Sequence, residues 1–288
     1  MLQLRHAPMS TPSTPSCSND APDLFQTISI LPYAIPTQTS TDLEALRYQY
    51  CGQEDYAILA PSDSTTWVVY FHSYGGNALE IFNSPLIHPL WLDAVKRAGF
   101  GLASFDTFGD SWMAPYAADA IHNALSVIKQ RYPIKKLIFI GGSMGGSSVL
   151  IYSTRYPQDV TAALAMCPVS DIGTHYEQSR NHPDPDYYMK SWPIERHYGA
   201  SEALRKEAFQ LNSVIQNAHK LTMPLVISHG TGDTWIPVSH SDHLATLLTG
   251  RKDFKYFRYP DADHFFPSVQ GFKDSWPWIL GSLDHINH

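Results

Sequence analysis

The chain has 288 residues, of which 43% are hydrophobic and 16% are charged, as in a soluble globular protein with enough apolar material for a large core. Its formal net charge is −7 at pH 7, and its longest basic run is Lys135-Lys136. Both features argue against nucleic acid and anionic membrane surfaces as partners. No apolar stretch approaches the roughly 20 residues that a membrane span requires.

The first 23 residues are rich in Pro, Ser and Thr and lack the apolar run of a secretory signal. We predict that residues 1–23 form a disordered arm and that residues 24–288 form a single domain. The cysteines, Cys17, Cys51 and Cys167, are odd in number and scattered along the chain. They do not predict a disulfide framework, and they favour a reducing, cytoplasmic location.

Polar and apolar residues alternate between residues 24 and 61, which predicts antiparallel strands with one solvated face at a sheet edge. Further along, short apolar runs predict strands at 67–71, 102–105, 137–140, 162–166, 225–228 and 254–259. Helical patterns lie between them: one ends near Ala98, and others cover 121–132, 148–156 and 278–286. Strands that alternate with helices predict an α/β fold with a mainly parallel central sheet and helices on both faces.

The segment from about residue 171 to 222 is longer than a helical crossover between parallel strands requires. It holds six aromatic residues among prolines and charges: Tyr176, Tyr187, Tyr188, Trp192, Tyr198 and Phe209. Long segments at the carboxyl ends of strands usually form sites. We predict a small lid-like insertion, helical from about 201 to 219, that forms one wall of a substrate pocket. The alternative is an exposed meander with structural aromatic residues.

Gly141-Gly142-Ser143-Met144-Gly145 stands between the apolar run 137–140 and a helical pattern. A serine in so sharp a strand-to-helix turn is exposed as a nucleophile, and glycines beside it remove Cβ atoms that would clash. Met144 opens the helix, so its backbone N–H has no helical partner and can hold an oxyanion. The motif therefore predicts Ser143 as the nucleophile and Met144 as one oxyanion donor.

A serine nucleophile requires a base and a carboxylate that orients the base. Asp233 follows the strand at 225–228, and His264 follows the strand at 254–259. The order Ser143, Asp233, His264 is the one expected for a nucleophile elbow on a parallel sheet. We predict these three residues as the catalytic triad.

Other residues compete for the same roles. Asp261 and Asp263 lie closer to the histidine in sequence than Asp233 does, but carboxylates beside a turn usually hydrogen-bond the turn itself. His229 is an alternative base, although a packing role is more usual inside the acid loop. His240, Asp242 and His243 have near-helical spacing without further matching ligands, so the sequence predicts no metal site. It predicts no cofactor either, because the glycine run around Ser143 lacks the residues of a nucleotide loop.

From about Thr65 to its end, the chain resembles the α/β-hydrolase family at the elbow, the acid loop and the histidine loop. The segment 201–237, with P-L-V-I-S-H-G-T-G-D-T-W-I-P, is most similar to the catalytic domains of prolyl-oligopeptidase-type enzymes and to dienelactone-hydrolase-like esterases. The resemblance implies an α/β-hydrolase fold and a serine hydrolase mechanism. It does not fix a substrate.

The resemblance also implies a His-Gly loop after an early strand, which lends a second oxyanion donor. The corresponding loop here is His72-Ser73-Tyr74-Gly75-Gly76, with serine where the family has glycine. We predict the amide of Tyr74 as the second donor, with Gly75 as the alternative. His72 is expected to brace the loop, and Asp106 and Asp110 to organise a loop that borders the pocket.

The expected function is hydrolysis of a small or medium carboxylic ester through an acyl-enzyme, with Tyr74, Trp192 and Trp235 contacting the substrate. The segment before Thr65 is too short for the gating propeller of prolyl oligopeptidases, which favours a small-molecule ester as the substrate. The alternatives are peptidase, amidase or lactonase activity, and a non-catalytic ligand receptor that retains the triad. The sequence does not predict an oligomeric state.

Overall fold

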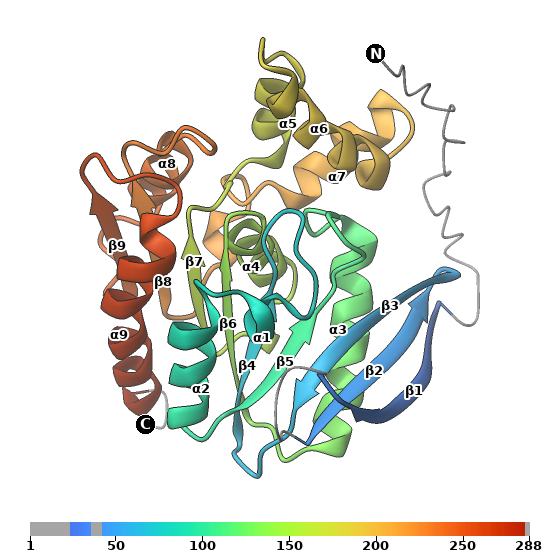
Figure 1. The fold of residues 1–288 in the computed structure, drawn as a ribbon. Helices are drawn as coiled ribbons and strands as arrows, with labels where there is room; N and C mark the ends of the chain where they lie inside the picture. Colours follow the sequence, from blue (N-terminus) through green and yellow to red (C-terminus); the bar gives the residue numbers. More distant parts are fainter. Residues whose placement is uncertain (1–23, 36–41, 286–288) are drawn as a thin grey trace, which may run out of the picture.

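The computed structural model describes residues 24–35 and 42–285, so the predicted arm, residues 1–23, lies outside the described residues. Within the described part, one nine-stranded sheet has the strand order β1-β2-β3-β5-β4-β6-β7-β8-β9 (Figure 1). The strands are β1 (Phe25–Tyr33), β2 (Leu43–Tyr50), β3 (Gln53–Ala60), β4 (Thr66–Phe71), β5 (Gly101–Phe105), β6 (Lys136–Gly142), β7 (Ala162–Met166), β8 (Leu225–Gly230) and β9 (Phe254–Tyr259).

Helices connect most of these strands. The α-helices are α1 (Glu80–Asn83), α2 (Asp93–Arg97), α3 (Pro115–Arg131), α4 (Met144–Arg155), α5 (Ile172–Arg180), α6 (Pro185–Tyr198), α7 (Glu202–Asn212), α8 (Ser239–Leu247) and α9 (Phe272–His285). Two short segments are 3-10 helices, η2 (Pro157–Asp159) and η3 (Ala218–Lys220), and two are π-helical, η1 (His88–Leu92) and η4 (Pro267–Gly271).

The sheet is antiparallel at one edge and parallel elsewhere. The pairing is antiparallel for β1–β2, β2–β3 and β3–β5. It is parallel for β5–β4, β4–β6, β6–β7, β7–β8 and β8–β9. Every residue of β4, β5, β7 and β8 is buried, as expected of strands with helices on both faces. The predicted mainly parallel α/β-hydrolase fold, with its antiparallel edge, is confirmed.

Two apolar cores lie on opposite faces of the sheet. Neighbouring strand residues alternate between them, so that Val69 faces the core with α3, α4 and α8, and Val68 faces the core with α2 and α9. Helix α3 buries Ile121, Leu125 and Ile128, which recur at helical spacing along one side. Helix α9 begins at Phe272, earlier than predicted, and contains Pro277.

The segment between β7 and β8 carries α5, α6 and α7, which lie beyond the end of β7 at the top of Figure 1. Two of the helices have side-chain caps: Asp171 Oδ1 accepts hydrogen bonds from Gly173 N and Thr174 N, and Ser201 Oγ accepts one from Leu204 N. The predicted helix over 201–219 is shorter, ending at Asn212, and the sequence pattern does not predict α5 and α6. A third apolar cluster joins this insertion to the sheet: Trp112, Ala114, Met144, Val169, Ile172, Tyr176, Ile194, Tyr198 and Ile236.

The cysteines differ in state. Cys51, in the turn after β2, is disulfide-bonded, which the sequence does not predict. Cys167, directly after β7, is a buried free thiol. Across residues 24–35 and 42–285, no helix has both the length and the apolar character needed to cross a membrane.

Candidate active site

Ser143 occupies the turn between β6 and α4 with φ 57° and ψ −122°, a left-handed backbone that a non-glycine residue rarely adopts. Two close approaches make the turn possible. A Cβ on Gly141 would lie 2.4 Å from the backbone carbon of Gly145, and a Cβ on Gly145 would lie 2.2 Å from the carbonyl oxygen of Phe71. The amide of Ser143 donates to the carbonyl of Met166 on β7 at 2.8 Å, which fixes the turn to the sheet.

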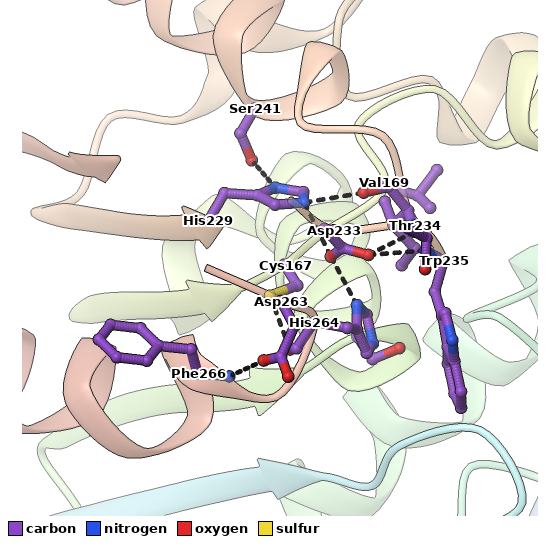
Figure 2. Close-up of polar contacts among 12 residues, drawn as sticks. Cys167, Val169, His229, Asp233, Thr234, Trp235, Ser241, Asp263, His264 and Phe266 are labelled. Atoms are coloured by element: carbon purple, nitrogen blue, oxygen red, sulfur yellow. Dashed lines mark hydrogen bonds and ion pairs between the residues drawn. The ribbon is translucent and has the colours of Figure 1, made fainter. Parts of the chain in front are cut away.

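Asp233 and His264 lie in the loops after β8 and β9 and contact each other directly (Figure 2). His264 Nδ1 lies 2.6 Å from Asp233 Oδ2, so the carboxylate holds the proton on Nδ1 and leaves Nε2 as the acceptor. The other carboxylate oxygen, Oδ1, accepts the backbone amides of Trp235 at 2.8 Å and Ile236 at 2.9 Å. Both residues are buried, with 8% of Asp233 and 6% of His264 exposed.

The hydrogen bonds to Asp233 control its ionisation. Burial alone would raise the pKa of Asp233, but the hydrogen bonds from His229 and His264 outweigh burial and hold the pKa well below its usual range. The carboxylate is therefore charged at neutral pH and can stabilise an imidazolium on His264.

The two loops are held together by backbone contacts. Thr231 N donates to Tyr259 O at 2.8 Å, and Gly232 N donates to Ala262 O at 2.9 Å. A Cβ on Gly230 would lie 2.2 Å from the carbonyl oxygen of Ala262, so only glycine permits this approach.

Asp263 has the turn-stabilising role expected for it. Its Oδ1 accepts the backbone amides of Phe265 at 3.0 Å and Phe266 at 2.9 Å, within its own turn. The carboxylate that is hydrogen-bonded to the imidazole of His264 belongs to Asp233.

Two sets of contacts connect His264 to the elbow. Ser143 bonds Met166, and the next residue, Cys167, donates its thiol to the carbonyl of His264 at 3.2 Å. Trp235 stacks on His264 with 5.3 Å between ring centroids and also lines a pocket with Ser143. Among the described residues, no hydrogen bond joins Ser143 Oγ to the imidazole of His264, and such bonds are often long before substrate binds.

The loop after β4 has hydrogen-bonded backbone amides on both sides of Tyr74. Ser73 N donates to Glu80 Oε2 at 2.8 Å, and Gly75 N donates to Asp110 Oδ1 at 2.7 Å. Gly76 N donates back to Ser73 O at 2.9 Å. Within the described residues the amide of Tyr74 has no such partner, so Tyr74 fits an oxyanion donor better than Gly75 does.

His72 has the bracing position expected for it. Its side chain is fully buried, with Nε2 2.6 Å from Asp106 O and Nδ1 2.8 Å from Ser73 O. The histidine thus ties the loop after β4 to the loop after β5. Asp110 reaches the same region through its bond to Gly75.

A narrow pocket of about 20 Å³ opens beside Ser143. Its lining comprises Tyr74, Trp112, Ser143, His175, Trp235 and Ile236. Two of the three residues expected to contact substrate, Tyr74 and Trp235, are among them. Trp192 lies on α6 with 45% of its surface exposed and is not part of this lining.

Three residues of the pocket, His175, Trp112 and Ile236, are not predicted by the sequence. Trp112 is held in the pocket by a left-handed backbone, φ 51°, and its ring lies 4.8 Å from that of His175 on α5. Only the run of aromatic residues in the insertion and the Trp-Ile pair after Asp233 hint at such a lining.

The residues considered above as metal ligands do not form one site. Asp242 accepts hydrogen bonds from Arg258 and Tyr256, whereas His240 is buried against Ser170 through its carbonyl oxygen. Over the part of the chain that the structure describes, the one cluster with metal-ligand spacing is Cys167, Asp233 and His264. That cluster contains the Asp233–His264 pair itself.

The family comparison matches the prolyl oligopeptidase family over residues 109–284, more than half of the chain. The matched range includes Ser143, Asp233 and His264. No curated protein sequence matches significantly.

Solved structures with the same fold include esterases and a peptidase. The chain is similar to Est1E from Butyrivibrio proteoclasticus, with 16% identity, a TM-score of 0.60, and coverage of 85% of this chain and 100% of that one. It is similar to an acetyl xylan esterase from Paenibacillus sp. R4, with 16% identity, a TM-score of 0.61, and coverage of 89% and 88%. It is also similar to a puromycin-hydrolyzing peptidase from Mycobacterium tuberculosis, with 17% identity, a TM-score of 0.56, and coverage of 77% of this chain but 36% of that one.

Proposed function

Because the chain belongs to the prolyl oligopeptidase family, within the serine hydrolases of the α/β-hydrolase fold, we propose that it hydrolyses a carboxylic ester with a short acyl group. The observation that carries this proposal is the buried 2.6 Å contact between Asp233 and His264, together with a serine in a left-handed elbow that shares a pocket with Trp235, the residue stacked on His264. These are the parts that a weak alcohol needs in order to attack an acyl carbon.

In the proposed mechanism, Ser143 Oγ attacks the acyl carbon while His264 Nε2 takes its proton. Asp233 stabilises the imidazolium through Nδ1–H. The amides of Met144 and Tyr74 donate to the oxyanion of the tetrahedral intermediate. His264 then protonates the leaving alcohol, and water releases the acyl group from Ser143 by the same route.

The size of the pocket supports a short acyl group. About 20 Å³ accommodates little more than one water molecule, which suits the methyl group of an acetyl ester better than a longer acyl chain. Trp112, His175 and Ile236 would contact this group, and Tyr74 and Trp235 border the entrance. Trp235 has 44% of its surface exposed and stacks on the imidazole that protonates the leaving group, so we place the alcohol portion against it.

The test is hydrolysis of p-nitrophenyl esters of increasing acyl length by the full chain and by Ser143→Ala. We expect turnover to be highest for acetate and to fall with chain length. Ser143→Ala should lose on the order of 10⁵-fold or more in kcat. The matched control is Ser126→Ala, on the exposed side of α3, which should keep full activity. Equal activity of the wild type and Ser143→Ala would overturn the proposed mechanism.

Amide hydrolysis is the second candidate, because the matched family is one of peptidases and one similar structure is a puromycin-hydrolyzing peptidase. The same assay with aminoacyl p-nitroanilides separates the two. A higher kcat/KM for the anilides than for the acetate ester would assign a peptidase. Absence of turnover on both the esters and the anilides, together with measurable binding of a ligand in the pocket beside Ser143, would favour a non-catalytic ligand receptor.

A further inference from the structure

His229, the fifth residue of β8, is fully buried behind Asp233 (Figure 2). Its Nε2 lies 3.1 Å from Asp233 Oδ2 and 3.0 Å from the carbonyl oxygen of Ile236. Its Nδ1 lies 2.7 Å from Ser241 Oγ, on α8. Both ring nitrogens therefore have partners, and one of these is the carboxylate that holds His264.

The partners of Nε2 determine where the proton of His229 lies. A carbonyl oxygen and an ionised carboxylate can only accept hydrogen bonds, so Nε2 must be the donor to both. In the neutral ring, Nδ1 is then the acceptor, and the hydroxyl of Ser241 donates to it. The environment thus selects the Nε2–H tautomer and turns that proton toward Asp233.

We propose that His229 is a positioning residue that holds Asp233 in the orientation required by His264, an inference that rests on the proposed function. Two backbone amides hold Oδ1, and His229 supplies the second donor on Oδ2, beside His264 at 2.6 Å. The side chain of Asp233 is fully buried, so bulk solvent does not reach it to replace a lost donor. His229 thereby fixes the rotation of the carboxylate about its Cβ–Cγ bond.

His229 also moderates the basicity of Asp233. A donor on Oδ2 draws charge away from the side that faces His264, so removal of this donor strengthens the attraction between Asp233 and an imidazolium. The other ionisable groups close to this pair are Cys167, His240, Asp242 and Asp263. They are the same in every variant compared below.

The experiment compares His229→Gln with His229→Asn. The glutamine amide reaches about as far as Nε2 and can donate to Asp233, whereas the shorter asparagine amide reaches only about as far as Nδ1. We expect His229→Asn to lower kcat about 10- to 100-fold, and His229→Gln to restore most of it. In His229→Asn the acidic limb of the kcat/KM profile should also move to higher pH. Urea unfolding of both variants shows whether either loss comes from unfolded protein.

A purely structural role would lower stability without moving the acidic limb, and it would not distinguish glutamine from asparagine. Equal kcat values and unchanged pH profiles in the two folded variants would overturn the proposal. If neither variant folds, ¹⁵N chemical shifts of the wild-type histidines decide, since an Nδ1–H tautomer at His229 contradicts the assignment. This measurement needs no turnover, so a wild-type chain inactive on every ester would refute the proposed function and still leave the tautomer test valid.

Discussion

Left-handed backbone conformations gather around the candidate site. Of the eight non-glycine residues with positive φ in the described chain, seven lie in loops at the carboxyl ends of strands in the parallel part of the sheet: Thr107, Phe108, Trp112, Met113, Ser143, Cys167 and Asp261. Each such conformation costs on the order of 1 kcal/mol or more and persists only where surrounding contacts hold it. At Ser143 these contacts include bonds to Met166 and from Ser147. Backbone strain is therefore concentrated in the loops that orient the side chains of the candidate site.

The glycine at position 145 should tolerate no larger residue. Gly145→Ala places a methyl group 2.2 Å from a backbone oxygen, which cannot move without shifting β4. We expect a loss of about 3 kcal/mol or more in the free energy of unfolding. The matched control is Gly281→Ala in α9, where nothing lies within 4 Å of the new Cβ. That substitution should stabilise the protein by about 0.5–1 kcal/mol. Urea denaturation of both variants measures the difference, and similar effects would contradict the tight packing of the elbow against β4.

Among the elements, the β2–β3 pair carries a buried carboxyl opposite a tyrosine. Tyr48 and Asp55 are register partners, and the tyrosine hydroxyl donates to Asp55 Oδ2 at 2.6 Å. Burial raises the pKa of Asp55 from 3.8 to about 7, outweighing the hydrogen bond from Tyr48. In the unfolded chain the carboxyl loses its proton near its ordinary pKa, whereas the folded protein keeps the proton until about pH 7. The folded state therefore binds more protons between these values.

Stability should consequently fall as pH rises through this window, by at most about 1.4 kcal/mol per pH unit from Asp55. Asp55→Asn keeps an acceptor for Tyr48 and removes the titration. We expect the variant to depend less on pH between about 4 and 7, and to be more stable than the wild type above pH 7. Urea denaturation at several pH values tests this, and parallel curves for the two proteins would refute it.

The insertion α5–α7 contributes His175 to the pocket, where it packs on Trp112. His175→Ala should enlarge the acyl site, because the imidazole forms part of its wall. The preferred p-nitrophenyl ester should then shift from acetate toward butyrate or hexanoate, by about tenfold in relative kcat/KM. Trp192→Ala, on the exposed side of α6, should leave the preference unchanged. If Trp192→Ala alters the chain-length profile and His175→Ala does not, the substrate lies elsewhere.

At the scale of the whole molecule, the sequence is sufficient to predict the sheet and to propose the residues of the triad. Continuous apolar runs such as 67–71 arise because helices cover both faces, and the elbow motif is local enough to be read directly. The contacts of α5, α6 and the pocket cannot be predicted in the same way. Trp112, His175 and Ile236 are far apart in sequence, and their meeting depends on how a long insertion packs. From the sequence alone, His229 could be considered only as an alternative base. Its position beside Asp233 depends on contacts with Ile236 and Ser241, and these contacts follow from the tertiary structure.

The two apolar cores share one sheet, and neighbouring residues of each central strand belong to opposite cores. Loss of packing on one face therefore removes support from the other. We expect a single cooperative thermal transition for residues 24–288, in line with the predicted single domain. Differential scanning calorimetry measures this through the ratio of calorimetric to van 't Hoff enthalpy, which should be close to one. Two separated transitions would contradict it, and the insertion would then be a separate folding unit.

The close approach of Gly230 to Ala262 has a consequence for protein engineering. Segments 230–237 and 259–266 come from successive strands, yet the first fits only against the particular backbone path of the second. Chimeras that graft one of these segments from a relative would pair two surfaces that did not evolve together. A chimera should therefore take segments 230–237 and 259–266 from the same parent protein. This is achieved when the exchanged region begins inside β8 and ends after η4.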